Sequence, residues 1–402
     1  MHYVIIGNSA AAIGAAESIR AVDRDSKLTI VGDEPRHVYS RPLISHFIAG
    51  KVDTDQIRFR PLDFYKRLKI DARLGVRAES VDVDAHAVTL ADGKSIHYDK
   101  LLLATGSVQG FLPIKGREHA GIFDFWTLSQ AEAIRDRISG CDVQLSCTAV
   151  VICAGLVGIQ AAYGLRGAGM TVVLIEPQPF ILSRLLDAAG AAYVQGMLER
   201  GGVRVLTGRS IKEIQATADE GATSVVMDNG ERIECGLVIN ATDGAPNLAL
   251  VRGSSIRTNR GVTVDEHFQT NVPDVYAAGD VAEAYDVTTG RMFVSANWPN
   301  AHAQGRVAGS NMAGFPTAYT GSVGVTSMPL FGKAIASQGI VEPESGDEVL
   351  VRESHENQVY QKMVFRKERL IGAVMVGDVS TVGLLNHFKF FGYEWGWTPL
   401  FA

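Results

Sequence analysis

The stretch YVIIGNSAAA, residues 3–12, predicts a buried strand that runs through a glycine turn into an Ala-rich helix. A second apolar strand, LTIV at residues 28–31, follows this helix and is closed by the acidic pair Asp33 and Glu34. This order of elements presents N–H groups at a helix N-terminus to a pyrophosphate and places a carboxylate where a ribose would lie. The segment therefore predicts a parallel α/β sheet that binds a dinucleotide.

A second segment, residues 149–176, repeats this order. The strand AVVI at residues 149–152 leads through CAGLVG (153–158) into a helix, and the next strand, TVVLI (171–175), is followed by Glu176. A short glycine pattern often arises by chance, so a structural turn without a ligand is the alternative for either segment alone. Two complete units in one chain favour two bound dinucleotides and electron transfer between them.

A third motif, VYAAGD at residues 275–280, ends in Asp280. A carboxylate directly after Ala-Ala-Gly at a predicted strand end is hard to explain as a core residue or as surface decoration. With further motifs, this one gives the chain its resemblance to the FAD-dependent pyridine-nucleotide oxidoreductases of the disulfide-type fold. Those further motifs are YSRP (39–42), LATG (103–106), NW (297–298) and AQG (303–305).

Within that family the chain resembles the branch without a redox disulfide. This branch holds rubredoxin reductase, the nitrite reductase flavin module and the FAD/NADH subunit of phenylglyoxylate dehydrogenase. The resemblance covers nearly the whole chain and implies FAD and NAD(H) as cofactors. It implies two Rossmann-like domains, for FAD (residues 1–113 and 244–318) and NAD (114–243), and a C-terminal α+β interface or docking domain (319–402).

The resemblance also assigns residues to each cofactor. Those for FAD are Gly7, Ser9, Ala10, Glu34, Arg41, Pro42, Thr105, Gly106, Gly279, Asp280 and Trp298. Those for NAD(H) are Gly155, Val157, Gly158 and Glu176. Glu176 predicts NAD(H) rather than NADP(H), because a carboxylate at this strand end pairs with a ribose 2′-hydroxyl and repels a 2′-phosphate. Trp298 has an alternative as an ordinary core residue.

The two turns depart from the family pattern at four positions. Ser9 and Ala12 stand where the first turn often has glycine, and both are small enough to let a phosphate approach. Cys153 replaces the first glycine of the second turn, and Asp243 replaces a glycine further along. Because Asp243 would repel a pyrophosphate if it faced one, we expect NAD to bind less securely than FAD.

The region around residue 46 bears on the reaction type. Disulfide-type relatives place a redox cysteine here, and others place a lysine paired with a glutamate. This chain has Ser45 and His46, with Gln160 at the facing helix position. The resemblance therefore implies a neutral His46–Gln160 pair beside the flavin, in which His46 donates to the flavin or stabilises its reduced charge. A structural histidine is an equal alternative.

Bulk properties exclude several classes of protein. The 402 residues carry a net charge of −6, so no broad basic field predicts nucleic acid or an anionic membrane as a partner. The four cysteines, Cys141, Cys147, Cys153 and Cys235, form no C-x-x-C motif. Small buried thiols are favoured over a metal site made from the first three.

The sequence predicts a cytoplasmic protein without a membrane span. The first strand begins at residue 2, which leaves no room for a signal peptide. Residues 147–164 are apolar enough for a span, but their glycines and Gln160 favour a buried strand, turn and helix.

The predicted function is electron transfer through FAD between NAD(H) and an external iron–sulfur or rubredoxin-type carrier. The chain would act as the electron-transfer subunit of a larger, anaerobic 2-oxoacid dehydrogenase-like complex, either as a hetero-oligomer or as a homodimer. A free-standing NADH oxidase and a non-catalytic flavin-binding protein are the alternatives. The aromatic C-terminal tail, residues 388–401, is the predicted docking surface, with packing into its own domain as the alternative.

Overall fold

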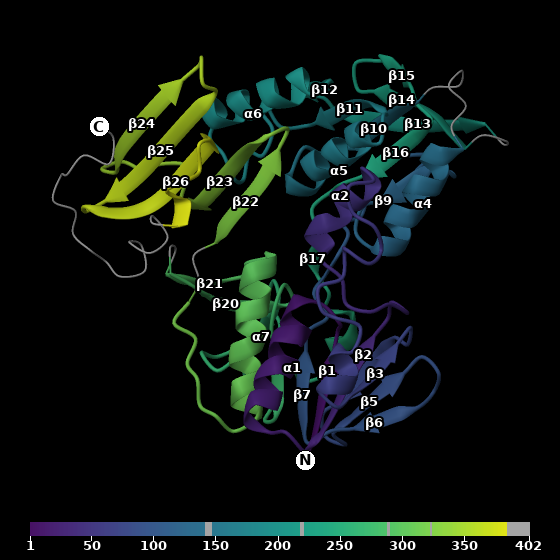
Figure 1. Cartoon of the computed structure of the whole chain (residues 1–402), viewed down its shortest axis with the longest axis vertical. Helices are drawn as coiled ribbons and strands as arrows, with labels where there is room; N and C mark the ends of the chain where they lie inside the picture. The colour runs from purple at the N-terminus through teal and green to yellow at the C-terminus, as the bar shows by residue number, and fades with distance from the viewer. Residues whose placement is uncertain (141–146, 218–220, 288–289, 322–323, 384–402) are drawn as a thin grey trace. The chain divides into compact units, whose positions relative to one another are not determined.

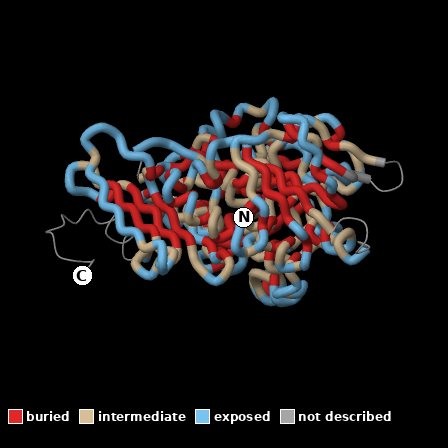
Figure 2. The backbone as a smooth tube through the Cα atoms, turned by 90° about the horizontal axis from the view of Figure 1, so that it is seen from above, coloured by how far each residue is buried: buried red, intermediate tan, exposed pale blue. Residues whose placement is uncertain are grey.

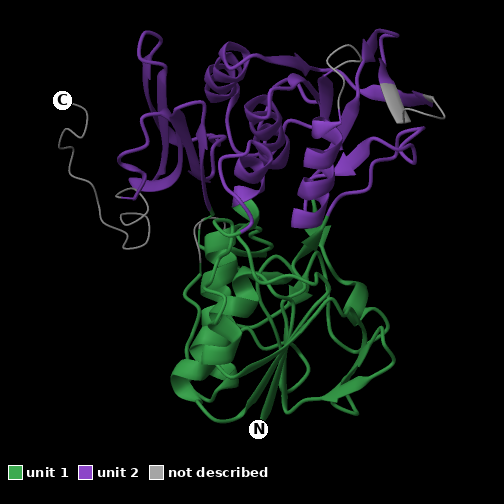
Figure 3. Ribbon diagram, turned by 45° about the vertical axis from the view of Figure 1, so that its right-hand side comes forward, with its two compact units in different colours: residues 1–42, 55–108, 244–324 green, residues 43–54, 109–243, 325–402 purple. Residues whose placement is uncertain are grey.

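The computed structural model describes residues 1–140, 147–217, 221–287, 290–321 and 324–383. Contacts divide the chain into two compact units, coloured separately in Figure 3. Unit 1 comprises residues 1–42, 55–108 and 244–324, and unit 2 comprises residues 43–54, 109–243 and 325–402. The division into FAD, NAD and C-terminal domains stays a prediction, because the two units are defined by contacts between residues and not by the ligands that the residues would bind.

Unit 1 is built on a five-stranded parallel sheet with strand order β19-β7-β1-β2-β3. Its strands are β1 (His2–Ile6), β2 (Lys27–Gly32), β3 (Ile70–Leu74), β7 (Lys100–Leu103) and β19 (Val275–Ala277). Its helices are α1 (Ala10–Val22), α3 (Phe64–Arg67) and α7 (Trp298–Met312), and η1 (Arg41–Leu43) and η2 (Ala249–Val251) are 3-10 turns. The central strands are continuous apolar runs, as expected for a parallel sheet buried on both faces, and Figure 2 shows buried strands in red.

Helices α1 and α7 lie side by side in unit 1 (Figure 1). Glycines permit this close packing. A side chain at Gly14 would collide with the backbone of His302, and one at Gly305 would collide with the backbone of Ala11. The AQG motif at residues 303–305 is therefore explained by helix packing against the first glycine-turn helix.

Three smaller sheets complete unit 1. They are β4 (Ala78–Asp82), β5 (Ala87–Leu90) and β6 (Ser95–His97); β8 (Ser107–Val108) and β17 (Ala245–Pro246); and β18 (Val262–Thr263), β20 (Ala282–Asp286) and β21 (Arg291–Phe293). In the first of these, the turn at residues 91–93 lies between β5 and β6.

Unit 2 contains a second five-stranded parallel sheet, with order β12-β11-β10-β16-β9. Its strands are β9 (Ile122–Asp124), β10 (Thr148–Ile152), β11 (Thr171–Glu176), β12 (Val203–Thr207) and β16 (Leu237–Asn240). The helices are α2 (Ile44–Ile48), α4 (Leu128–Ser139), α5 (Leu156–Gly167) and α6 (Ala188–Arg200). A three-stranded sheet consists of β13 (Ile211–Thr217), β14 (Gly221–Met227) and β15 (Arg232–Glu234), and residues 228–230 lie in the turn between β14 and β15.

Unit 2 also contains the C-terminal sheet, which is antiparallel with order β22-β23-β26-β25-β24. Its strands are β22 (Val325–Leu330), β23 (Lys333–Gly339), β24 (Glu348–Ser354), β25 (Val359–Arg366) and β26 (Arg369–Gly377). The predicted docking surface, the aromatic tail at residues 388–401, lies outside the described residues.

A buried ion pair ties the C-terminal sheet to α6 within unit 2. Asp187, the N-cap of α6, accepts hydrogen bonds from the Lys362 ammonium and the Tyr360 hydroxyl, each at 2.7 Å. The side chains of Asp187 and Lys362 are 12% and 8% exposed. On β23, Gln338 is also buried, and among the described residues neither of its amide atoms has a hydrogen-bond partner.

Candidate functional site

The glycine turn after β1 has the geometry of a phosphate-binding turn. Gly7 has a φ of +123°, and a Cβ there would collide with the backbone carbonyl of Ala104. Only glycine allows this close approach. Ser9 is the N-cap of α1 and Ala10 is its first residue, and the Ser9 side chain makes no capping hydrogen bond. The first N–H groups of α1 are therefore suited to an anion.

The carboxylate predicted for the ribose, Glu34, follows β2 and has two side-chain partners. It accepts a hydrogen bond from the Tyr39 hydroxyl at 2.8 Å and one from the Arg41 guanidinium at 2.7 Å. Arg41 is followed by the exposed Pro42 in η1. Because a guanidinium has five N–H donors, Arg41 can hold Glu34 and still donate to a phosphate. The structure therefore brings Glu34 and Arg41 together before any ligand is considered.

Asp280 lies after β19 and accepts a hydrogen bond from the Ser107 hydroxyl at 2.9 Å. Burial raises the pKa of the Asp280 carboxyl, against the opposing effects of that hydrogen bond and of the Arg41 charge. A buried carboxylate is costly unless it is hydrogen-bonded, and its two oxygens can accept more bonds than Ser107 supplies. The site thus suits a ligand that brings further hydroxyl donors.

The neighbouring backbone is shaped by glycines and held by a buried side chain. Gly279 has a φ of +83°, and its N–H donates to the Gln304 side chain at 2.8 Å. Gly106 has a φ of +67° with no atom within 4 Å of the place a Cβ would take. Thr105 donates its hydroxyl proton to the carbonyl of Asn247 at 2.9 Å. Thr105, Gly106 and Gly279 therefore form an ordered backbone surface near Asp280.

Trp298 begins α7 directly after the N-cap Asn297. Its ring packs edge-on against Phe59, with 5.2 Å between ring centroids, and it borders the hydrophobic core of unit 1. These contacts account for the tryptophan as a core residue, and its position beside the flavin stays a prediction.

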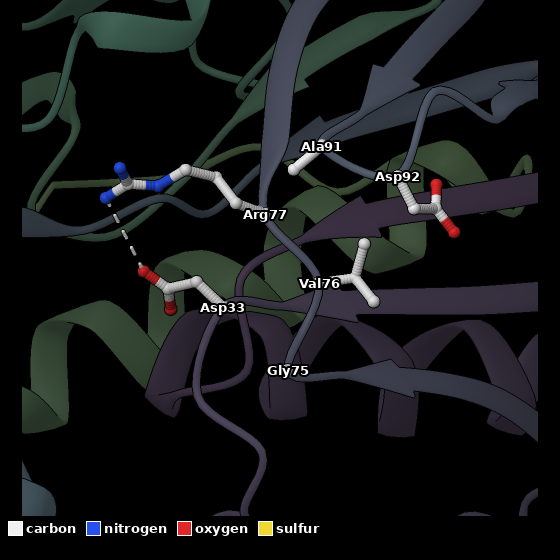
Figure 4. A pocket seen from close by; sticks show the side chains of 6 residues that line it. All are labelled: Asp33, Gly75, Val76, Arg77, Ala91 and Asp92. Atoms are coloured by element: carbon white, nitrogen blue, oxygen red, sulfur yellow. Dashed lines mark ion pairs between the residues drawn. The ribbon is translucent and has the colours of Figure 1, made fainter.

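A cavity of about 880 Å³ opens beside the glycine turn of unit 1, and Gly7, Thr105 and residues 246–254 contribute to its lining. A second cavity of about 520 Å³ shares Asp33 and Arg77 with it, and Figure 4 shows this cavity. The carboxylate of Asp33 and the guanidinium of Arg77 are 4.0 Å apart. The cavity at Gly7, the close approach at that turn and the partly buried Asp280 carboxylate together fit FAD.

The second glycine turn retains the fold of a dinucleotide turn despite its altered sequence. Cys153 adopts a φ of +75°, a left-handed conformation that glycine would take without strain. Gly155 is the N-cap of α5, and Val157 lies in the first turn of that helix. A side chain at Gly158 would collide with the carbonyl of Cys153. The turn therefore fits NAD(H), although the backbone of Cys153 is strained in this conformation.

The Cys153 thiol is unsuited to nucleophilic chemistry. Burial raises its pKa to about 11, and the charges of Glu176 and Asp243 act in the same direction. The thiol is therefore protonated at neutral pH, and its role is steric.

Glu176 is a buried carboxylate at the end of β11, with 8% of its surface exposed. It accepts hydrogen bonds from the N–H groups of Ala154, at 2.6 Å, and Gln178, at 2.9 Å. One of these bonds runs to the glycine turn itself. Glu176 therefore fixes the turn in addition to its predicted bond with a ribose hydroxyl.

Asp243 lies beside the same turn, because a Cβ on Gly155 would be 3.3 Å from its carboxylate. The Arg184 guanidinium pairs with Asp243 at 2.7 Å. The expected repulsion between Asp243 and a pyrophosphate is reduced by this pairing. Both side chains are largely exposed, so the pair itself is worth only about 0–1 kcal/mol.

The predicted partner of Gln160 is corrected by the structure. Gln160 accepts a hydrogen bond from the Ser45 hydroxyl at 2.8 Å, and its amide nitrogen lies 3.2 Å from the Met328 sulfur. His46 instead packs its ring against Tyr163, with centroids 5.6 Å apart. Ser45 is buried on the face of α2 that meets α5, whereas His46 is only partly buried on the adjacent face.

The charge state of His46 follows from its surroundings. Burial lowers the pKa of His46, and the positive charge of Lys51 lowers it further. The Lys51 ammonium donates to the Tyr163 hydroxyl at 2.6 Å, so it is held close to the imidazole. His46 is therefore neutral at neutral pH, with one ring nitrogen as donor and the other as acceptor.

The sequence analysis assigns no role to several residues that make contacts at the site. They are Ser107, Gln304, Tyr39, Arg184 and Ser45. Ser107 directly follows the LATG motif and Gln304 lies within the AQG motif, so both could have been found from these motifs. Arg184 had no local signal.

Two further findings concern the described part of the chain only. It holds no group of three or more His, Cys, Asp or Glu side chains arranged for a metal ion, and Cys141 lies outside it. None of its helices combines the length and apolar character needed to cross a membrane.

Comparison with known proteins places the chain in a family. Residues 1–305 match the model of the pyridine nucleotide-disulphide oxidoreductases. The chain belongs to this family. It is an oxidoreductase whose cofactors are FAD and NAD(H), as the sequence predicts. Residues 325–387 match the C-terminal domain of rubredoxin NAD+ reductase, so both the predicted family and its branch are confirmed.

Individual relatives agree with this assignment. The chain is 32% identical over 365 residues to the NADH-dependent phenylglyoxylate dehydrogenase subunit epsilon of Aromatoleum evansii, covering 90% of this chain and 85% of that one. It is 32% identical to the nitrite reductase [NAD(P)H] of Bacillus subtilis over 94% of its own length, but it spans only 46% of that protein. The crystal structure of NADH:rubredoxin oxidoreductase from Clostridium acetobutylicum superimposes with a TM-score of 0.80 at 25% identity, covering 99% and 97% of the two chains.

Proposed function

We propose that this oxidoreductase passes electrons between NAD(H) and an external iron–sulfur or rubredoxin-type carrier. The observation that carries the proposal is the joining of two dinucleotide turns to a C-terminal domain of the rubredoxin NAD+ reductase type, residues 325–387. The solved NADH:rubredoxin oxidoreductase matches this chain along nearly its whole length, which supports the same pairing of donor and acceptor.

The chain's own residues would hold the flavin and leave the redox chemistry to it. When bound, FAD supplies a centre that exchanges a hydride with nicotinamide and exchanges single electrons with a carrier. Gly7 and the first turn of α1 would receive the pyrophosphate, Glu34 a ribose hydroxyl and Asp280 a ribityl hydroxyl. The N–H groups of the turn can donate to phosphate oxygens, and the carboxylates of Glu34 and Asp280 can accept hydrogen bonds from hydroxyl groups.

The α2 helix supports a route without a thiol relay. It carries Ser45 and His46 and has no cysteine, so no redox-active thiol can form on this helix. We propose that neutral His46 donates a hydrogen bond to the flavin, as the family resemblance implies. Gln160 would act through Ser45, whose hydroxyl it holds, rather than through His46.

We further propose that NADH is preferred over NADPH and that the chain works as a subunit of a larger complex. The buried Glu176 supports the first point, because a 2′-phosphate beside it would meet a negative charge. The relative named as subunit epsilon of a phenylglyoxylate dehydrogenase supports the second, because it aligns over 90% of this chain.

An anaerobic half-reaction experiment tests the proposed electron route. The FAD-loaded chain is reduced with one equivalent of NADH, and the flavin absorbance is followed by stopped flow. The reduced chain is then mixed with oxidised rubredoxin, with a ferredoxin of the two-iron type, or with oxygen. We expect full bleaching by NADH, followed by faster reoxidation by one of the two protein carriers than by oxygen.

A matched pair of variants separates the proposed role of His46 from a structural one. His46→Ala should keep its FAD and slow reduction by NADH or shift the flavin potential, whereas His355→Ala, at an exposed position in the turn between β24 (Glu348–Ser354) and β25 (Val359–Arg366), should change neither. Unaltered rates and potential in His46→Ala would make His46 a structural residue. Reoxidation by oxygen that outpaces both carriers would instead indicate a free-standing NADH oxidase.

A further inference from the structure

The loop between β11 and α6, residues 177–187, brings a basic side chain to the second glycine turn. The Arg184 guanidinium lies 2.7 Å from one carboxylate oxygen of Asp243. The other oxygen of that carboxylate would lie 3.3 Å from a Cβ on Gly155, the N-cap of α5. The guanidinium is therefore separated by a single carboxylate from the helix start at which a pyrophosphate would bind.

The charge at this turn depends on Arg184. The turn is formed by three segments, residues 153–158, 176–187 and 240–243. They contain three acidic residues but only one basic residue, Arg184. Two of the acidic side chains, Glu176 and Asp187, are bound by backbone N–H groups and by a lysine, respectively, whereas the third, Asp243, is paired with Arg184. Arg184 is thus the only cation that these segments can offer to an anionic ligand.

The loop that carries Arg184 is fixed to the glycine turn, while the guanidinium itself is open. The Leu182 N–H donates to the carbonyl of Ala154, within the turn, at 3.0 Å. The side chains of Ile181, Leu182 and Leu186 are buried. The Arg184 side chain, in contrast, is 82% exposed. A guanidinium has five N–H donors, so Arg184 can pair with Asp243 and still donate to a ligand.

The C-terminal sheet holds the same loop from its other end, because this sheet lies beside α6 (Figure 1). The hydroxyl of Ser337, on β23, donates to the carbonyl of Leu185, the residue after Arg184. Asp187, at the end of the loop, is bound by the Lys362 ammonium of β25. The sheet therefore fixes the backbone that directly follows Arg184.

We propose that Arg184 binds the pyrophosphate of NAD(H) and that the C-terminal sheet positions it for this contact through Ser337. The proposal rests on the assignment of the second glycine turn to NAD(H). A guanidinium suits this ligand, because its planar N–H groups can donate to two phosphate oxygens at once. With the nucleotide bound, Arg184 lies between the Asp243 carboxylate and the phosphates, so it offsets their repulsion while it donates to the ligand.

Two other roles for Arg184 lead to different expectations. If the guanidinium only neutralised Asp243, it would contribute nothing to binding once Asp243 had lost its charge. If it bound the 2′-phosphate of NADP(H), its removal would weaken the binding of that nucleotide alone. The ion pair lies beside Gly155, at the start of α5, which favours the pyrophosphate over a 2′-phosphate.

Calorimetric titration of the FAD-loaded full chain, with its flavin oxidised, tests the contact. NAD+ and ADP-ribose both contain the pyrophosphate and neither reduces the flavin, so the titration measures binding alone. Arg184→Ala should raise the Kd of both by about tenfold, the lower end of what a hydrogen bond to a charged group contributes. The matched control Arg232→Ala removes another exposed Arg–Glu pair, on β15, and should leave both Kd values unchanged.

A double-mutant cycle separates contact with the ligand from neutralisation of Asp243. Asp243→Asn removes the negative charge beside the turn and should lower the Kd of NAD+ and of ADP-ribose. Adding Arg184→Ala to this variant should raise both Kd values again by about tenfold, because the contact with the pyrophosphate is still lost. Arg184→Ala should also weaken the binding of NADP+, which contains the same pyrophosphate.

Ser337→Ala tests the positioning role. It should raise the Kd of NAD+ and of ADP-ribose by less than Arg184→Ala does, and it should have no further effect when Arg184 is already Ala. A hydroxyl that only stabilised the fold would change the Kd by the same factor in both backgrounds, and that result would overturn the positioning role. Ser327→Ala, at an exposed position of β22, is the matched control and should change neither Kd. Flavin content and melting temperature show that each variant is folded.

Three results would overturn the contact while leaving the NAD(H) site in place. The first is an Arg184→Ala chain that binds NAD+ and ADP-ribose like the wild type. The second is a double variant R184A/D243N that binds them like Asp243→Asn alone. The third is a loss of binding confined to NADP+. A wild-type chain that bound neither NAD+ nor ADP-ribose would instead overturn the assignment of the turn itself, and the proposal with it.

Discussion

Replacing Glu176 should change the preference for NADH over NADPH and weaken the glycine turn at the same time. In Glu176→Ala, the N–H groups of Ala154 and Gln178 lose their acceptor. The N–H of Ala154 is buried, and leaving it unsatisfied costs about 1–3 kcal/mol, whereas Gln178 is exposed and its N–H can bond to water. The lost bond to a ribose hydroxyl adds about 1.5–3 kcal/mol, the range for a hydrogen bond to a charged group.

These magnitudes predict different effects on the two substrates. The ribose bond alone corresponds to a fall of roughly 10- to 150-fold in kcat/KM for NADH. Activity with NADPH should suffer less, because removal of the carboxylate also removes its repulsion of the 2′-phosphate. Glu176→Gln keeps one acceptor oxygen. It should therefore lower the ratio of kcat/KM for NADH to kcat/KM for NADPH while destabilising the turn less than Glu176→Ala does.

Initial rates with ferricyanide as the acceptor, measured over a range of NADH and NADPH concentrations, give both values of kcat/KM. Glu199→Ala, at an exposed position on α6, is the matched control and should leave the ratio unchanged. The reasoning would be refuted if Glu176→Gln kept its thermal stability and its flavin yet showed the wild-type ratio. Glu176 would then stabilise the turn without a hydrogen bond to the ribose hydroxyl.

Further predictions concern the flavin site, the buried polar groups and His46. Asp280→Ala should lose most of its FAD, measured as flavin absorbance per chain; full loading would contradict the ribityl assignment. Lys362→Met should lower stability by about 3–5 kcal/mol, because it leaves a buried carboxylate without its cation, and urea unfolding measures this. Gln338→Met should raise the melting temperature, since it removes amide atoms whose unsatisfied burial costs about 1–3 kcal/mol each. Lys51→Ala should raise the pKa of His46 in an NMR titration, though burial should still hold it below the ordinary value.

Much of the fold could be predicted because it depends on local pattern. A run of apolar residues, a glycine turn and a helix identify each dinucleotide unit, and the positive φ at Gly7 is a backbone requirement that only glycine meets without strain. Even the altered second turn keeps this conformation, since Cys153 adopts the left-handed backbone of the glycine it replaces. The spacing of strand, turn and acid therefore predicts a dinucleotide unit better than the identity of any one residue does.

Two features could not be predicted because they depend on packing between distant segments. Ser45 and His46 are adjacent in sequence, and only the rotation of α2 decides which of them faces Gln160. That rotation is set where α2 packs closely on α5, with Gly164 against the backbone of Ser45. Arg184 reaches Asp243 from a separate segment of the chain, and no local pattern signals such a pair.

The discontinuous build of unit 1 has a consequence for how the chain folds during synthesis. Helix α1 leaves the ribosome early, but α7, against which it packs, begins only at Trp298. Strand β19 likewise completes the sheet late, beside β7. At roughly 5–20 residues per second, the apolar face of α1 waits on the order of tens of seconds for its partner. The parallel sheet of unit 2 is translated within that interval, so its nucleotide fold can form first, while the apolar face of the nascent N-terminal segment is exposed to aggregation.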